Sequence, residues 1–253
     1  MTAIESGLRP LLRAAPLAGA ASIFTVLAFW SFLLSGAGMG MSIWSMSTLS
    51  FPAITPQPNM TMMPSGFLAY LVMWWVMMMA MMMPGTMKHL PLEAGRSRSA
   101  DSRIVAFWMG YAGIWLLFSA AAAVIQLYLV SSDLLHETMM WSTSGILNAC
   151  LLGLVGLYQL SPWKTRYLTA CLRFSASNRA FGDGLFYGLQ CLGSSAVLML
   201  LMLVFGVMNI YWMGILAALV ALEKWLKHPF VFSALIGVLC VAASLYLFVS
   251  VAF

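Results

Sequence analysis

Methionine is the residue type whose number and spacing in this sequence point most directly to chemistry. The chain contains 22 methionines, and seven of them fall among the eleven residues from 73 to 83. On a helix, Met77 and Met81 share one stripe, and Met78 and Met82 share another. Thioethers are soft, neutral donors that select Cu(I) over hard cations. The pattern therefore predicts metal contact by these four residues, although methionines can also simply fill gaps between helices.

Two further groups of soft donors lie in segments between apolar runs. They consist of Met60, Met62 and Met63, and of His136, Met139 and Met140. If the second group is helical, its imidazole and two thioethers share one face. Both groups are predicted to capture a soft metal ion outside the membrane. The alternative for the second is an apolar loop that lies on the membrane, with a surface histidine.

Cys191 and Glu223 complete the set of candidate metal ligands. Cys191 lies within an apolar run, where it is either a thiolate ligand or a small buried hydrophobe. Glu223 precedes Lys224 at the end of another apolar run, and ionisable residues in such places are functional candidates. The alternative for Glu223 is an interfacial ion pair that ends the helix. The four cysteines are widely separated, so they form no CxxC pair and indicate no disulfide framework; they are Cys150, Cys171, Cys191 and Cys240.

Motifs of enzymes and of nucleic-acid binding are missing from the sequence. It contains no GxSxG, Walker A, GxGxxG or HExxH pattern. The net charge is +5, but no basic stripe interleaved with aromatic residues occurs. We therefore expect no enzyme, no catalytic residue and no nucleic-acid partner. The soft donors described above indicate copper as the metal ion that the protein handles.

The composition predicts that the elements carrying the candidate ligands are helices that cross a membrane. Hydrophobic residues make up 62% of the chain and charged residues 8%, against about 25% charged in soluble domains. Apolar runs of about 20 residues match the length of a spanning helix. The sequence predicts an all-α polytopic bundle of about seven helices in a single membrane domain, residues 1–253. These helices are expected near residues 17–34, 66–87, 104–130, 142–161, 184–207, 210–226 and 229–253.

The positive charges predict how the chain is oriented. All 12 Lys and Arg residues fall in the N-terminal tail and in every second loop, including a basic loop from Lys164 to Arg179. Cytoplasmic loops carry such an excess. We expect a cytoplasmic N-terminus and a multi-pass protein of a bacterial inner (plasma) membrane. Its partners would be the lipid bilayer and either other membrane subunits or further copies of the chain.

The stretch Met73-Trp74-Trp75-Val76-Met77-Met78-Met79-Ala80-Met81-Met82-Met83-Pro84 resembles the hallmark of a bacterial family of predicted metal-binding integral membrane proteins, a domain of unknown function. Further similar segments are residues 156–164, 191–193, 198–199, 206–213 and 223–224. The family usually continues Cys-Leu-Gly with Cys-Cys-Trp, where this chain has Ser194-Ser195-Ala196. The resemblance implies a metal-binding protein whose remaining ligands include Met81, Met82, Cys191 and Glu223.

Two functions fit these observations. In the first, the protein transports or delivers Cu(I) through its methionine-rich helix. In the second, it is a structural or assembly subunit of a larger membrane complex, such as a copper-dependent oxidase.

Overall fold

The protein is a bundle of α-helices. A computed structural model describes residues 15–35, 66–90, 100–132, 145–207, 209–226 and 228–252, and no strand occurs among them. The helices are α2 (Pro16–Leu34), α3 (Phe67–Thr86), the 3-10 turn η1 (Met87–His89), α5 (Ala100–Ser131), α6 (Gly145–Leu160), α7 (Pro162–Leu172), α8 (Ala180–Met199), α9 (Leu201–Phe205), α10 (Ile210–Trp225) and α11 (Pro229–Ala252). The predicted all-α fold class is confirmed.

Length and composition identify the helices that can cross a membrane. Five described spans qualify, namely Pro16–Leu34, Phe67–His89, Ala100–Leu129, Ala180–Phe205 and Pro229–Ser250. A sixth arises if α6 and α7, which meet at an angle of 60°, act as one broken span. Helix α10 has only 16 residues and is about 24 Å long, which is shorter than the hydrocarbon core of about 30 Å. The chain is therefore a polytopic membrane protein with five or six such spans among its described residues.

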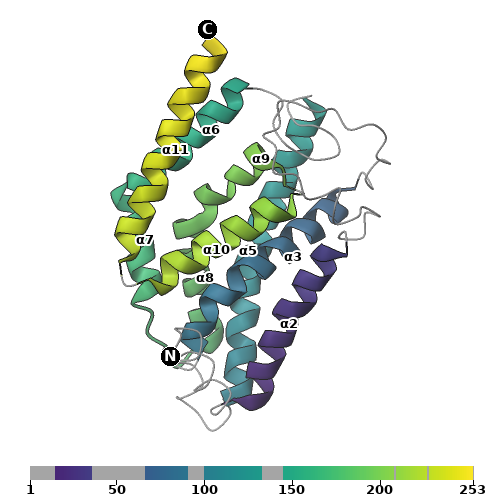
Figure 1. Ribbon diagram of the computed structural model, residues 1–253. Helices are drawn as coiled ribbons and strands as arrows, with labels where there is room; N and C mark the ends of the chain where they lie inside the picture. The colour runs from purple at the N-terminus through teal and green to yellow at the C-terminus, as the bar shows by residue number, and fades with distance from the viewer. Residues whose placement is uncertain are drawn as a thin grey trace.

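Helix α3, which carries the methionine cluster, is the most enclosed of these spans. In its apolar stretch 61% of the residues are buried inside the protein, against 22% for α2 and for α11. Figure 1 shows why, since α2 lies along one side of the bundle and the pair α6 and α11 along the other. Helix α3 contacts α2, α5 and α10. The methionines consequently face other helices and not lipid.

Helix α7 occupies a segment that the sequence suggested was a basic loop. Ser161 begins it as an N-cap, because its hydroxyl accepts a hydrogen bond from the Lys164 backbone N–H at 3.3 Å. Pro162 follows in the first turn, where its missing N–H costs nothing. The charged residues of α7 lower the hydropathy of this segment, so the pattern of apolar runs did not predict a helix here. The helix brings Lys164 into the core, where only 1% of the residue is exposed.

Helices α5 and α8 approach so closely that only glycine fits at their contact. A Cβ on Gly110 would lie 2.3 Å from the Phe181 carbonyl oxygen, and one on Gly184 would lie 2.1 Å from the Phe107 carbonyl oxygen. Backbone atoms cannot move aside as side-chain ends can. Small residues allow such approach between spanning helices, and here they fix the position of α8 against α5.

We expect alanine at this contact to destabilise the protein. Gly110→Ala or Gly184→Ala should each lower the free energy of unfolding by about 1–3 kcal/mol, the usual cost of overpacking. Gly113→Ala is the matched control on α5, since a Cβ there meets nothing within 4 Å. Thermal unfolding in a mild detergent measures both effects. Equal melting temperatures for Gly110→Ala and Gly113→Ala would contradict this account of the contact.

Candidate metal centre

The methionines of α3 are buried in the protein core. Met77 is 2% exposed, Met78 and Met82 are 0% exposed and Met81 is 1% exposed. Leucine would fill the same space in apolar surroundings, so burial alone does not assign them a metal. It does place their sulfur atoms where an ion could be held away from water and from lipid.

A chain of hydrogen bonds joins Met82 to Cys191 across three helices. The Thr86 hydroxyl donates to the Met82 carbonyl at 3.1 Å and lies 3.2 Å from the Tyr111 hydroxyl. The Tyr111 hydroxyl is in turn 3.4 Å from the Cys191 sulfur. On the other side, the Ser195 hydroxyl lies 3.8 Å from the Met82 sulfur and donates to the Cys191 carbonyl at 2.7 Å. These contacts tie Met82 of α3 to Cys191 of α8, on one side from the Met82 carbonyl to the Cys191 thiol and on the other from the Met82 sulfur to the Cys191 carbonyl.

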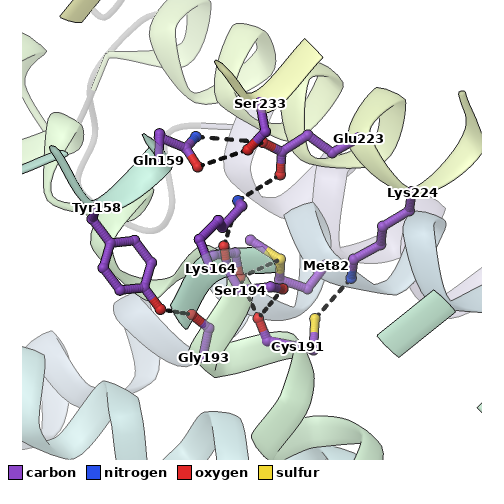
Figure 2. Close-up of polar contacts among 11 residues, drawn as sticks. Met82, Tyr158, Gln159, Lys164, Cys191, Gly193, Ser194, Glu223, Lys224 and Ser233 are labelled. Atoms are coloured by element: carbon purple, nitrogen blue, oxygen red, sulfur yellow. Dashed lines mark hydrogen bonds and ion pairs between the residues drawn. The ribbon is translucent and has the colours of Figure 1, made fainter. Parts of the chain in front are cut away.

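Lys224 of α10 reaches the same thiol. Its Nζ lies 2.8 Å from the Cys191 sulfur, and the residue is 2% exposed (Figure 2). Gly85 leaves room for the lysine stem, because a Cβ there would lie 3.0 Å from Lys224 Cδ. The ammonium also lies 5.8 Å from the centre of the Tyr187 ring. Lys88 donates to the backbone carbonyl of Lys224 and so ties η1 to the end of α10.

A second thiol, which the sequence did not single out, joins the cluster. Cys171 of α7 is 0% exposed, and because α7 packs against α8 its thiol comes within interaction range of the Cys191 thiol. Twenty residues separate the two cysteines in the chain, and they lie on different helices. No spacing motif in the sequence predicts this pair, because the two cysteines come together only when α7 packs against α8.

Glu223 belongs to a second polar network, which meets the first at Ser194 because the Ser194 hydroxyl donates to the Cys191 carbonyl at 2.9 Å (Figure 2). Its Oε2 accepts a hydrogen bond from Lys164 Nζ at 2.8 Å, and the two side chains are 2% and 1% exposed. Its Oε1 is 3.1 Å from the Ser233 hydroxyl and 3.4 Å from Gln159 Nε2. Lys164 also donates to the Ser194 carbonyl at 2.6 Å. Glu223 thus pairs with a lysine from α7, and not with its neighbour Lys224 at an interface.

The predicted capture residues lie outside the described residues; they are Met60, Met62, Met63, His136, Met139 and Met140. Among the residues that are described, no group of three or more His, Cys, Asp and Glu side chains could hold a metal ion. A metal site in this region would therefore have to use thioethers or fewer than three such ligands, as Cu(I) with soft sulfur donors permits.

Fold and site together define an all-α membrane protein with a buried cluster of sulfur side chains. A family model described as PpoB2, copper chaperone, matches residues 71–247, which is more than half of the chain. The chain belongs to this family of copper chaperones, and the predicted copper-handling role is confirmed at that level. The comparisons with curated proteins and with solved structures gave no match. Helix α2 lies outside the matched region, whereas every residue of the buried cluster lies inside it.

Removing both members of the ion pair should destabilise the protein less than the sum of the two single removals. Lys164→Met or Glu223→Gln leaves a buried charge without its partner, which costs about 3–5 kcal/mol. The double variant removes both charges, so its loss should be clearly smaller than the sum of the two single losses. Thermal unfolding in detergent measures all three. Arg166→Met on the exposed side of α7 is the control and should be near neutral; additive losses would contradict the coupling.

Proposed function

We propose that the protein is a copper chaperone of the membrane that holds Cu(I) on the sulfur atoms of its core and delivers it to a copper-dependent acceptor. The observation that carries the proposal is the Ser195 hydroxyl, which lies 3.8 Å from the Met82 sulfur and donates to the Cys191 backbone carbonyl at 2.7 Å, so that Met82 of α3 and Cys191 of α8 are close neighbours in the core. Membership of a copper chaperone family supports the same cargo. Copper is here the cargo and not a resident cofactor.

The chemistry of the cluster fits Cu(I) better than a hard cation. A thiol and thioethers are soft donors, which favour Cu(I). Thioethers stay neutral, so Met77, Met78 and Met81 can line a path through the core without the cost of a buried charge. Movement of an ion along such a path requires sites that bind weakly enough to release it. The methionines supply such sites, and Cys191 supplies the stronger one.

Copper content of the purified protein tests this proposal directly. Cys191→Ser should lower the bound copper to background, because it removes the strongest donor. Met82→Leu, which conserves volume, should weaken Cu(I) binding by about tenfold, equivalent to about 1.4 kcal/mol. Met109→Leu is the control, since Met109 is 64% exposed on the outside of α5. Elemental analysis and chelator competition in mild detergent provide the values, and wild-type copper content in Cys191→Ser would refute the proposal.

Delivery is tested in cells that make the protein. Copper accumulation and the activity of a copper-dependent membrane oxidase should fall when Met77, Met78, Met81 and Met82 are all replaced by leucine. The purified variant should keep the melting temperature of the wild type, which separates loss of copper handling from loss of folding. Unchanged copper handling together with a co-purifying membrane subunit would instead favour the assembly-subunit function.

A further inference from the structure

The least expected feature of the core is a pair of buried thiols from two helices beside a buried ammonium. Cys171 and Cys191 are each 0% exposed, and the packing of α7 against α8 brings the two thiols within interaction range of each other. Lys224 Nζ lies 2.8 Å from the Cys191 sulfur. We propose that Cys171 and Cys191 form a two-thiolate site for Cu(I), with the Lys224 ammonium as the counter-ion of the loaded site. This deepens the proposed function and rests on it.

Two sulfur ligands suffice for this ion. Cu(I) is a soft ion and binds stably between two thiolates in a nearly linear arrangement. Each thiol loses its proton on binding, because the thiolate is the form that ligates metals. One Cu⁺ and two thiols thus give one bis-thiolate complex with a charge of −1 and release two protons. A buried pair of thiols therefore provides a complete ligand set, without the third ligand that the described residues lack.

The charge of this complex explains the position of Lys224. A net charge of −1 in an apolar core is costly unless an opposite charge lies beside it. The ammonium of Lys224 already donates a hydrogen bond to the Cys191 sulfur. Among the described residues no other side chain is its hydrogen-bond partner. Glu223, the adjacent carboxylate, is paired with Lys164. Loading brings in one Cu⁺ and releases two protons, so the site changes from a charge of +1, the ammonium beside two thiols, to a neutral pair of complex and ammonium.

The surroundings fix the position of Cys191. Cys191 lies on α8, which the glycine contact fixes against α5. Tyr111, 3.4 Å from the Cys191 sulfur, can donate a hydrogen bond to it as a thiolate. Outer partners of this kind orient ligands and raise metal affinity. The alternative is that two small side chains merely pack together, and it predicts that Cys171 has no influence on copper.

Competition with the Cu(I) chelator bicinchoninate, on the full chain in detergent, tests the site. Cys171→Ser and Cys171→Ala should each weaken Cu(I) binding by about 100-fold or more, which exceeds the usual cost of losing an outer-sphere partner. Lys224→Met, which keeps the apolar stem but removes the charge, should weaken it by about 10- to 100-fold. The matched controls are Cys240→Ser, a buried cysteine of α11, and Cys150→Ser, an exposed one of α6, and neither should change the affinity.

A second measurement is independent of copper. Phenylarsine oxide binds tightly only where two thiols lie within reach of one arsenic atom. The metal-free protein should bind one equivalent, and Cys171→Ser or Cys191→Ser should abolish this binding, whereas Cys150→Ser and Cys240→Ser should keep it. Melting temperatures of all variants show that each remains folded. Arsenical binding that survives in folded Cys171→Ser would overturn the pairing of the two thiols.

The outcomes separate this inference from the function on which it rests. If the wild type binds no Cu(I), the proposed function and the two-thiolate site both fail. If Cys191→Ser loses copper while Cys171→Ser keeps wild-type affinity, the function stands and the two-thiolate site is wrong. Loss of affinity in both cysteine variants, with unchanged affinity in both controls, supports the site.

Discussion

The arrangement of the core depends on the buried ion pair between Lys164 and Glu223. Both charges lie away from water, and such a pair is tolerated only when the remaining hydrogen-bonding capacity is also satisfied. Gln159, Ser233 and the Ser194 carbonyl meet that requirement here. The ion pair and these three partners come from α6, α7, α8, α10 and α11, so a single network joins five helices. A bundle in lipid has no hydrophobic force between its helices, and polar contacts of this kind select one packing.

The ion pair also determines what the following residue can do. Glu223 and Lys224 are consecutive on α10, so their side chains leave the helix in different directions. Glu223 points to α7 and its neighbours, while Lys224 points to the thiol on α8 (Figure 2). Because Lys164 already neutralises Glu223, the charge of Lys224 stays available to the cluster of sulfur atoms. One helix thus anchors the bundle with one residue and supplies a cation to the candidate copper centre with the next.

Sequence alone revealed the class of fold and part of this centre. Long apolar runs require helices in lipid, and the spacing of methionines on α3 pointed to a core of soft donors, which the structure buries. Three features were missed. Helix α7 carries too many charges for hydropathy to detect, although its N-cap Ser161 and Pro162 are local signals of a helix start. The burial of Lys164 and the meeting of Cys171 with Cys191 depend on contacts between residues far apart in the chain, for which a single sequence offers no periodic signal. The copper ligands themselves remain a prediction, and the capture residues lie outside the described part of the chain.

Enclosure of the α3 methionines has a consequence for the lifetime of the protein. Thioethers that face solvent or unsaturated acyl chains are readily oxidised to sulfoxides, which are polar and would disrupt the packing of the core. Copper ions generate the very oxidants that cause this damage when they cycle between valence states. Met78 and Met82, both fully covered, are shielded by the helices around them from oxidants that form in water or in lipid. A protein with a methionine-rich core can in this way handle a redox-active metal with less oxidation of its own thioethers.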